Sequence, residues 1–368
     1  MNIVYIITKA DEIGGAQIHV RDLSLAMTQL GHNVTVIVGE PGALTEQLNK
    51  NKINLIIEPK LIRNISPIKD LICVVKLRSI LKKLSPDIVS LHSSKAGIIG
   101  RTALIGSKIP CIFTAHGWAF ADGVSNKRKK LYILIEKLFS NFCEKIITVS
   151  HQDKNLAIKF NVATANKQIV IHNGMPDKSV EFPKKNNTSN IINIITVARF
   201  SEQKDHYSLL KALSNLPKSN WTLNLVGKGP LEPEIKKLAS ELKLSEKINF
   251  LGERHDVSNL LSLADIFILP SNWEGLPRSI IEAMSFSLPV IASDVGGVNE
   301  MVSLSNGFLI PRGDIHTMSK AILTLIENEE TRISMGKKSR ETYCNSFNFQ
   351  KMLNRTHELY KTITGGNS

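Results

Sequence analysis

Short apolar runs alternate along this chain with longer stretches in which apolar residues recur at helical spacing. Apolar runs of about four to eight residues between polar turns are typical of strands that are buried on both faces. In the first half of the chain, strands are predicted at residues 2–7, 33–38, 53–57, 87–91, 111–114 and 145–149. The alternation predicts repeated β/α units around a mainly parallel sheet.

Helical stretches fill the intervals between these strands. Gly14 and Gly15 follow the first strand and open a predicted helix that extends to about Gly31. Residues 65–84 also have helical spacing, with apolar residues on one side and basic residues on the other. The apolar side of that helix consists of Ile68, Leu71, Ile72, Val75 and Leu81.

The pattern breaks at residues 173–190, a polar, turn-rich stretch that includes Pro176, Pro183 and the run 184–187. The alternation then restarts. Strands are predicted at residues 191–197, 221–226, 248–250 and 266–269, and helices near 207–216, 232–242 and 257–264. We therefore predict two α/β domains, residues 1–178 and 179–347.

A last amphipathic helix, residues 349–363, lies in the C-terminal segment 348–368. We expect it to pack back on the N-terminal domain or on the hinge. In open α/β sheets, ligands bind at the carboxyl ends of the strands. The loops that follow the predicted strands are therefore the places to look for chemistry.

Composition narrows the class of protein. A chain of 368 residues is too long for one ordinary core, and its 42% apolar and 21% charged residues are typical of a globular rather than a disordered protein. The four cysteines are scattered without zinc spacing, which favours thiols in a reducing compartment. The N-terminus lacks signal-peptide features, and no apolar run approaches the roughly 18 residues of a membrane span. We predict a cytoplasmic protein.

Positive charge is concentrated in the first half of the chain. Residues 1–180 carry 24 Lys and Arg against 13 Asp and Glu, whereas the remaining residues carry 22 against 20. Such an excess suits nucleic acid, an anionic membrane or an acidic substrate. A merely solvated basic surface is the simpler alternative. Only 6% of residues are aromatic, and they form no array interleaved with basic residues, which argues against nucleic acid.

Two glutamates, Glu274 and Glu282, stand eight residues apart directly after the strand predicted at 266–269. Pro277 suits the first turn of a helix, because its missing N–H would have no partner there. The free N–H groups of such a turn bind phosphate. Carboxylates beside a phosphate site suggest a ligand with phosphates and hydroxyls, such as a nucleotide sugar. The alternative is a surface glutamate and a glutamate near a helix terminus.

Two cations, Arg199 and Lys204, follow the first strand of the second domain. Cations on one loop beside a helix start suit a diphosphate leaving group, although ordinary surface charge is the alternative. Residues 226–231 follow the next strand and contain Gly227 and Gly229. Glycines permit close approach of the backbone to a ligand, so this loop suits a nucleotide base or is a simple turn.

Taken in chain order, these motifs resemble glycosyltransferase family 4, whose members are retaining enzymes of GT-B architecture. The resemblance covers nearly the whole chain; each motif is weak alone, and the ordered series is strong. The series is Gly14-Gly15, residues 113–117, Val149-Ser150, Asn173-Gly174, Arg199 with Lys204, Gly227-x-Gly229-Pro230, Glu274-x7-Glu282 and residues 294–300. Segments 92–97 and 116–120 are most similar to bacterial capsule and O-antigen members. The resemblance implies two Rossmann-like domains facing a central cleft.

By position, the resemblance implies catalytic roles for four residues. Arg199 and Lys204 would neutralise the donor diphosphate as the glycosidic C–O bond breaks, which is electrostatic help where charge develops. Glu274 would contact the sugar hydroxyls. His116 would lie against the transferred sugar, although a structural histidine is the alternative.

The resemblance also implies a set of donor-binding residues. Glu282 would hold the ribose hydroxyls, and backbone N–H groups near Leu276 would hold the phosphates, a task that Pro277 cannot share. The donor-binding set is Gly15, Gly229, Pro230, Leu231, Gly275, Leu276, Pro277 and Glu282. Residues 253–255 are a weaker candidate beside the base. On the acceptor and membrane side we place Gly14, His92 and Lys95.

The mechanism implied is transfer with retention at the anomeric carbon. Retaining glycosidases use a carboxylate nucleophile, but the resemblance places both glutamates on hydroxyls. We instead expect the leaving phosphate to help deprotonate the acceptor on the same face. No D-x-D motif occurs, so no metal and no cofactor are expected, and Arg199 and Lys204 would replace a divalent ion.

The expected substrates are a nucleotide-sugar donor, best guessed as a UDP-activated N-acetylhexosamine, and a polyprenyl-diphosphate-linked glycan of capsule or O-antigen synthesis. UDP-hexoses and GDP-mannose stay open. Arg278 would suit an acidic sugar, although a solvated helix residue is the favoured alternative. The basic first domain would rest on the anionic inner membrane surface. There Leu131, Ile135, Leu138 and Phe142 are expected mostly to face the core rather than the lipid. A nucleotide-sugar 2-epimerase of the same fold and a non-catalytic nucleotide-sugar-binding protein are the alternatives.

Overall fold

All strands of the first unit pair in parallel, in the order β3-β2-β1-β4-β5-β6-β7. We describe the protein from a computed structural model covering residues 1–11, 14–121, 123–182, 190–217 and 220–365. This unit comprises Met1–Asn173 and Met352–Ser368, and Gly174–Lys351 form the second. Each unit is described by itself, and the predicted cleft between the domains stays a prediction.

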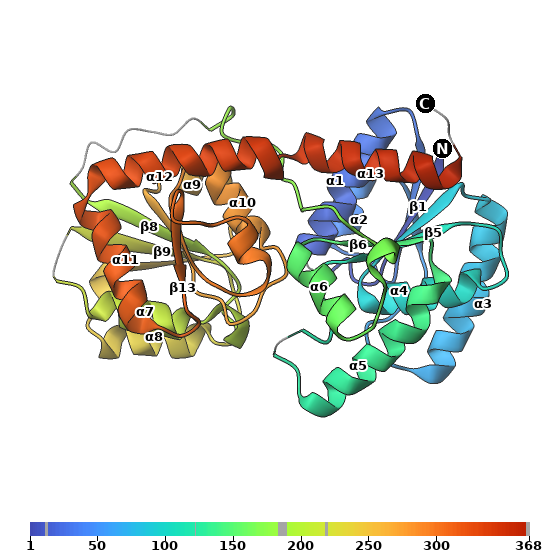
Figure 1. Cartoon of the computed structure of the whole chain (residues 1–368), viewed down its shortest axis with the longest axis horizontal. Helices are drawn as coiled ribbons and strands as arrows, with labels where there is room; N and C mark the ends of the chain where they lie inside the picture. The colour runs from blue at the N-terminus through green and yellow to red at the C-terminus, as the bar shows by residue number, and fades with distance from the viewer. Residues whose placement is uncertain (12–13, 122, 183–189, 218–219, 366–368) are drawn as a thin grey trace. The chain divides into compact units, whose positions relative to one another are not determined.

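The elements of the first unit alternate as the apolar runs predict, with one further strand, β7 (Figure 1). In chain order they are β1 (Asn2–Ile7), α1 (Gly15–Gln29), β2 (Asn33–Val38), α2 (Ala43–Lys50), β3 (Asn54–Ile57), α3 (Pro67–Leu84), β4 (Ile88–His92), α4 (Ser94–Leu104), β5 (Cys111–Ala115), α5 (Asn126–Phe139), η1 (Ser140–Phe142), β6 (Lys145–Thr148), α6 (His151–Lys159), η2 (Ala165–Lys167), β7 (Gln168–Val170) and α13 (Phe349–Thr364).

The second unit contains an all-parallel sheet in the order β10-β9-β8-β11-β12-β13. Its elements are β8 (Ile192–Val197), η3 (Glu202–Lys204), α7 (His206–Ser214), β9 (Trp221–Val226), α8 (Glu232–Glu241), η4 (Ser245–Lys247), β10 (Ile248–Gly252), α9 (Val257–Ser262), β11 (Ile266–Leu269), α10 (Arg278–Ser285), β12 (Val290–Ser293), η5 (Gly296–Glu300), β13 (Gly307–Ile310), α11 (Ile315–Glu327), α12 (Glu329–Thr342) and η6 (Tyr343–Phe347).

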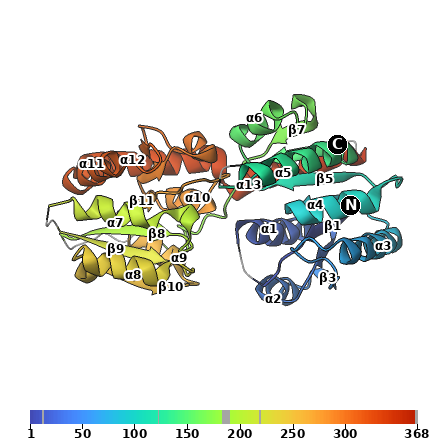
Figure 2. The same cartoon turned by 90° about the horizontal axis from the view of Figure 1, so that it is seen from below.

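Helices cover both faces of each sheet (Figure 2). Every residue of β4, β5, β11 and β12 is buried, which requires cover on both sides. One core cluster of the first unit joins α3 and α4 to the sheet through Leu77, Ile99 and Phe113. Two parallel-sheet α/β domains confirm the predicted fold class. Residues 183–189, part of the predicted turn-rich stretch, lie outside the described residues.

The C-terminal helix α13 packs on the first unit. Its buried side chains include Met352, Leu353 and Tyr360. Tyr360 is fully buried beside Tyr5 of β1 and Ser90 of β4. Burial, and then proximity to Tyr360, raises the pKa of Tyr5 well above its ordinary value. Helix α13 therefore packs over β1 and β4, the middle strands of the first sheet.

The surface of α3 differs from the prediction. Leu81 is buried with Cys73 and Leu77, but the other four residues of the predicted apolar side face solvent. Ile68 is 77% and Leu71 67% exposed. The four, Ile68, Leu71, Ile72 and Val75, follow i, i+3, i+4, i+7 spacing and form an outward stripe. Helix α3 thus has two apolar stripes, only one of which meets the core.

Helix α5 and the turn after it also contradict an expectation. Of the four residues that we expected to face the core, Ile135 is half-buried, whereas Leu131, Leu138 and Phe142 are exposed, as is Leu134. The buried position on this helix is the charged Glu136, which accepts a hydrogen bond from Arg101 of α4 at 2.8 Å. The side of α5 that meets the core carries Tyr132, Ile133 and Glu136 rather than the exposed leucines. No helix within the described residues is long and apolar enough to cross a bilayer.

Candidate functional site

The chain order of the second sheet reverses between β8 and β11. Strands β8, β9 and β10 follow one another outward, and the chain then returns to place β11 on the other side of β8. In open α/β sheets, ligands bind beyond the carboxyl ends of the strands at such a point. Arg199 and Lys204 follow β8, and Glu274 follows β11. The structure therefore brings these three predicted residues to one switch point.

Lys204 and Glu274 contact each other directly at this point. The Lys204 ammonium donates to Oε1 of Glu274, and Ser271 Oγ donates to the same oxygen at 2.6 Å. The Glu274 side chain is only 7% exposed. The backbone of Gln203 accepts from Asn272 N–H at 2.7 Å, which joins the two loops. Lys204, predicted to neutralise the diphosphate, and Glu274, predicted to contact the sugar, thus form an ion pair with each other.

The glycine loop after β9 lies against the Arg199 loop. Phe200 N–H donates to Lys228 C=O at 3.2 Å, and Leu231 N–H donates to Phe200 C=O at 3.2 Å. A Cβ on Gly229 would lie 2.2 Å from Phe200 O, closer than any side chain tolerates. Gly229 therefore allows close backbone packing. Pro230 and Leu231 lead into α8, while the weaker candidate 253–255 follows β10 as an exposed segment.

A third loop carries Gly275, Leu276 and Pro277 into α10. Gly297 N–H donates to Gly275 C=O at 2.7 Å, so the start of η5 holds this loop. Leu276 is buried. Pro277 was expected in the first helical turn but directly precedes it, with extended angles of φ −68° and ψ 118°. Helices commonly begin after such a residue, and the N–H groups of the first turn are still available to a ligand.

Glu282 lies within α10. Burial raises the pKa of the Glu282 carboxyl, and Arg278 one turn earlier opposes that rise. A carboxylate that is poorly solvated and close to a cation is suited to accept hydrogen bonds from hydroxyl groups. This environment is compatible with the predicted ribose contact.

The first sheet has its own switch point, between β1 and β4. Gly14 and Gly15 begin α1 after β1, and His92 ends β4. Ser93 has φ +80°, an unusual backbone for a residue with a side chain, and its hydroxyl caps α4. Lys95, predicted on the acceptor side, pairs with Asp70 at 2.5 Å. These residues lie together at the carboxyl edge of their own sheet.

Three histidines meet beside this edge. Nδ1 of His92 lies 3.0 Å from Nε2 of His116, and the His19 ring meets the His116 ring edge-on, with centroids 4.8 Å apart. One nitrogen from each of the three rings lies within 4.8 Å of the others, so they are able to hold a metal ion. Burial lowers the pKa of His92 well below its ordinary value, and His116 adds to that effect. Metal independence stays a prediction.

Several residues at the carboxyl edges of the two sheets were not predicted from the sequence. His19 and Ser90 surround the predicted histidines, and Asp70 holds Lys95. Ser271 was identifiable in principle, because it stands three residues before Glu274. Ser90 was identifiable as well, because it stands two residues before His92 on β4 and therefore lies on the same face of the strand. His19 and Asp70 come from separate elements, so no local spacing indicates them.

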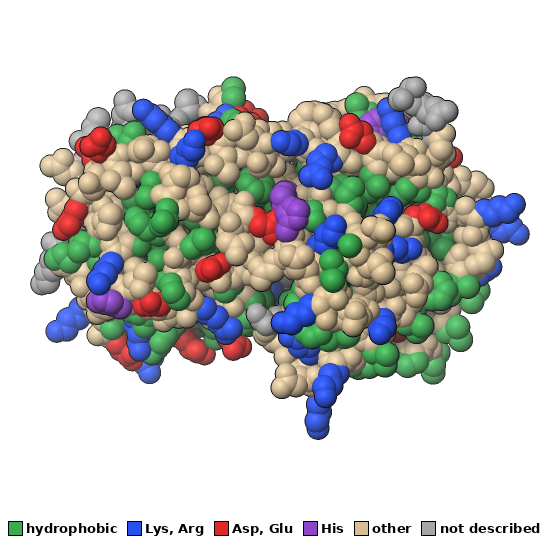
Figure 3. Space-filling model, viewed as in Figure 1, with side chains coloured by type: hydrophobic (Ala, Val, Ile, Leu, Met, Phe, Trp, Pro, Cys, Tyr) green, Lys and Arg blue, Asp and Glu red, His purple; other side chains and the backbone are tan. Residues whose placement is uncertain are grey.

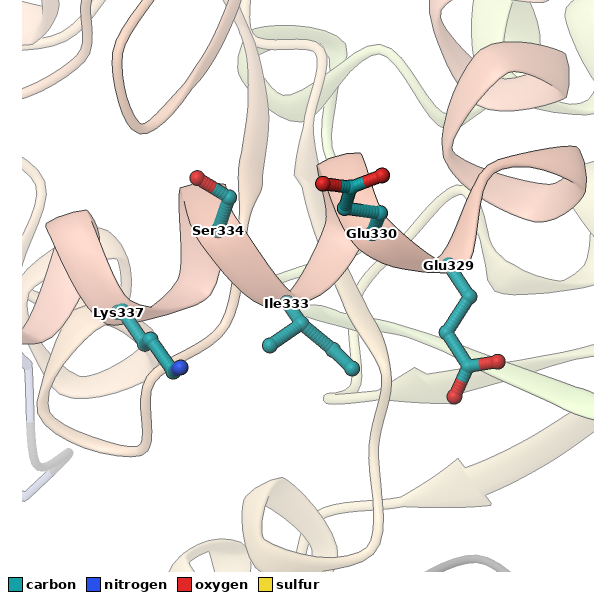
Figure 4. A pocket seen from close by; sticks show the side chains of 5 residues that line it. All are labelled: Glu329, Glu330, Ile333, Ser334 and Lys337. Carbon is teal, nitrogen blue, oxygen red and sulfur yellow. The ribbon is translucent and has the colours of Figure 1, made fainter.

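A surface hollow occurs away from these edges (Figure 4). It is lined by Glu329, Glu330, Ile333, Ser334 and Lys337 of α12. Figure 4 shows its side chains along one outer side of that helix, with no predicted site residue among them. The hollow therefore adds nothing to the candidate site.

Two family models together match most of the chain. The model described as "Glycosyltransferase Family 4" matches residues 13–178, and "Glycosyl transferases group 1" matches residues 177–342. One relative is the Escherichia coli "UDP-Gal:alpha-D-GlcNAc-diphosphoundecaprenol alpha-1,3-galactosyltransferase". It is 32% identical over 344 residues, which cover 89% of this chain and 88% of that protein. A Staphylococcus aureus relative, "Capsular polysaccharide biosynthesis glycosyltransferase CapM", is 27% identical over 89% of both chains.

Solved structures show the same fold. A glycosyltransferase from Rickettsia africae superposes with a TM-score of 0.83 at 24% identity, covering 100% of this chain and 99% of the other. Anabaena HepE in complex with UDP also gives 0.83, at 22% identity, covering 98% and 100%. These structures establish the GT-B architecture. The chain is a glycosyltransferase and belongs to glycosyltransferase family 4.

Proposed function

We propose that this chain is a retaining enzyme that transfers a sugar from a UDP-activated donor to a polyprenyl-diphosphate-linked glycan during capsule or O-antigen synthesis. The observation that carries this proposal is the Lys204–Glu274 pair at the switch point of the second sheet. The printed names of the relatives support the substrate classes, since one uses UDP-Gal and a diphosphoundecaprenol-linked acceptor. N-acetylhexosamine is the proposed sugar, and galactose is its competitor.

Arg199 and Lys204 stabilise the diphosphate as charge develops on it. Glu274, already held by Ser271, accepts hydrogen bonds from the sugar hydroxyls. When the donor binds, Lys204 is shared between Glu274 and the phosphates, so its charge is in place before the bond breaks. Glu282 holds the ribose hydroxyls, and N–H groups around Gly275 and Leu276 hold the phosphates.

The bond from the anomeric carbon to the diphosphate oxygen breaks, and a bond to the acceptor oxygen forms on the same face. The acceptor hydroxyl gives its proton to the departing diphosphate. Glu274 is committed to Lys204 and Ser271, so it is poorly suited to act as a nucleophile. No metal or other cofactor takes part in this proposal, because the two cations supply the positive charge.

The first unit receives the acceptor and rests on an anionic membrane. Helices α3 and α5 both pack against α4 and leave apolar stripes exposed. Exposed Lys and Arg accompany those stripes, namely Lys69, Lys76, Arg78, Lys82 and Lys83 on α3 and Lys127, Arg128, Lys130 and Lys137 on α5. On the visible face of this unit, apolar and basic side chains gather along the edge where α3 and α5 lie (Figure 3). Apolar stripes flanked by cations suit an anionic bilayer interface.

A donor-hydrolysis and transfer assay tests the proposal. Purified protein receives UDP-N-acetylhexosamines, UDP-galactose and GDP-mannose with a lipid-diphosphate acceptor, and Glu274→Gln and Arg199→Ala are assayed beside the wild type. Loss of one preorganised charge contact is expected to lower kcat by about 10²- to 10³-fold. Lys237→Met, an exposed change on α8, is the control and should behave as wild type.

Wild-type turnover in both site variants would refute the residue assignment. Conversion of a UDP-sugar to its 2-epimer without any acceptor would instead favour the epimerase alternative. Tight donor binding without transfer or hydrolysis would favour a binding protein.

A further inference from the structure

His92 is a fully buried histidine whose two ring nitrogens both have polar neighbours. Its Nδ1 lies 3.0 Å from His116 Nε2, and its Nε2 lies 3.0 Å from Ser90 Oγ. A buried imidazole is disfavoured as a cation, and the pKa of His92 is accordingly well below its ordinary value. A neutral ring carries one hydrogen, so one of its nitrogens donates and the other accepts.

The hydrogen bond between the two rings also restricts which nitrogen of His116 carries a hydrogen. If Nδ1 of His92 donates, Nε2 of His116 must accept and carries no hydrogen. If Nδ1 of His92 accepts, Nε2 of His116 must donate. In either arrangement the contact couples the tautomer of His116 to that of His92 and leaves Nδ1 as the other ring nitrogen of His116. The two rings are also stacked, with centroids 5.3 Å apart and planes 29° apart, which fixes the orientation of His116.

The chain of contacts continues into the core. Ser90 lies beside Tyr360 of α13, and burial raises the pKa of Tyr360 to about 12, so this hydroxyl stays protonated at neutral pH. His19 of α1 contacts both other imidazole rings, with centroids 5.4 Å from His92 and 4.8 Å from His116. His92 is therefore held from behind by Ser90, which itself contacts Tyr360, and it has little freedom to rotate.

We propose that His92 is a positioning residue that sets the tautomer and ring orientation of His116. Its consequence for turnover rests on the proposed function, in which His116 lies against the transferred sugar. Ser90 supports the same role by occupying the far nitrogen of His92. The acceptor-side placement expected for His92 from the sequence is replaced in this proposal by a supporting role behind His116.

Two substitutions separate this role from simple core packing. His92→Asn places an amide near the position of Nδ1 and is able to keep the contact with His116. His92→Gln reaches only the position of Nε2, keeps the contact with Ser90 and loses the contact with His116. Both are amides in the same buried place, so a purely structural residue would tolerate them similarly. Thermal unfolding of each variant provides the measure of folding.

Nitrogen-15 NMR of the full chain, labelled at histidine, reads the tautomer of His116 without any substrate. The wild type and His92→Asn should show one tautomer, and His92→Gln should show a mixture. Transfer should fall by about 100-fold in His92→Gln, as expected for a misplaced group, and by much less in His92→Asn. Tautomer averaging in the wild type, or an unchanged His116 signal in His92→Gln, would overturn the proposal.

Metal content provides a further check. Stoichiometric zinc in protein purified without chelator would also overturn the inference, because coordination would replace the hydrogen bond between the two rings. A changed tautomer with wild-type turnover would support the positioning of His116 and refute the proposed role of His116 on the sugar. Failure of the inference and failure of the proposed function therefore have different signatures.

Discussion

Lys204 lies close to the carboxylate of Glu274 and to the buried imidazole of His206. Its ammonium contacts Glu274, while His206 two residues later stacks on Phe200 with ring centroids 4.4 Å apart. The carboxylate compensates the charge of the lysine, which in the proposed function also meets the donor phosphates. The pKa of His206 is lowered because burial disfavours the charged imidazole and the charge of Lys204 repels it, so the ring stays neutral at pH 7. At the carboxyl edge of the second sheet, Lys204 is therefore charged while the neighbouring His206 is neutral.

His206 makes stability depend on pH. Burial, and then the charge of Lys204, lowers the pKa of His206 from its ordinary value to about 4. The unfolded chain binds a proton near pH 6.5 and the folded chain only near pH 4. The free energy of unfolding is therefore independent of this group above pH 6.5 and falls as the pH drops towards 4, by about 3 kcal/mol in total.

Urea unfolding at pH 7 and pH 4.5 measures this loss, with His206→Phe as the comparison because it keeps the ring stack on Phe200. The wild type should lose about 2 to 3 kcal/mol more than the variant between the two pH values. Equal losses would show that His206 is not held neutral in the folded chain.

At the scale of elements, glycines let three loops of the second unit approach one another. Gly296 has φ +57°, and a Cβ there would lie 2.0 Å from the carbonyl oxygen of Glu274. The start of η5 therefore supports the loop that carries Glu274.

Gly296→Ala should weaken donor binding, with Gly313→Ala as the matched control. Gly313 also has a positive φ, +74°, but no atom lies within 4 Å of its Cβ position. Both changes should cost about 1–2 kcal/mol in backbone strain. Only Gly296→Ala must displace Glu274, so only it should reduce the donor affinity measured by calorimetry. Equal donor affinities in the two variants would contradict this account of the loop.

At the scale of the whole molecule, charge and exposed apolar surface coincide on the first unit. Removing Ile68 and Leu71 from a bilayer interface forfeits about 3 kcal/mol, which is roughly 100-fold in affinity. The double variant Ile68→Ser, Leu71→Ser should therefore bind vesicles of phosphatidylcholine with phosphatidylglycerol far more weakly. Leu304→Ser in the second unit, equally exposed at 79%, should bind as wild type.

Vesicle co-sedimentation checks this prediction at two salt concentrations. Binding should weaken as salt rises and should disappear when phosphatidylglycerol is omitted. Binding that ignores salt, lipid charge and the double substitution would remove the membrane from the proposal.

Much of this fold follows from local pattern. Buried parallel strands are continuous apolar runs, so β1, β2, β9 and β11 begin and end where the runs do. The pattern does not say which apolar stripe of α3 meets the core, because the helix has two of them. Nor does it find His19 beside His92 or Asp70 beside Lys95, since both reach their partners from other elements. Those contacts depend on sheet order, which the sequence leaves open.

Helix α13 has a consequence for how the chain folds during synthesis. The first unit contains residues 1–173, but the buried Tyr360 beside β1 and β4 is made only after the whole second unit. Until then, one face of the first sheet lacks its cover and its apolar residues are exposed to other nascent chains. The ribosome must therefore complete the later unit before the earlier one can close. Premature termination between the two units would release a sheet that is prone to aggregate.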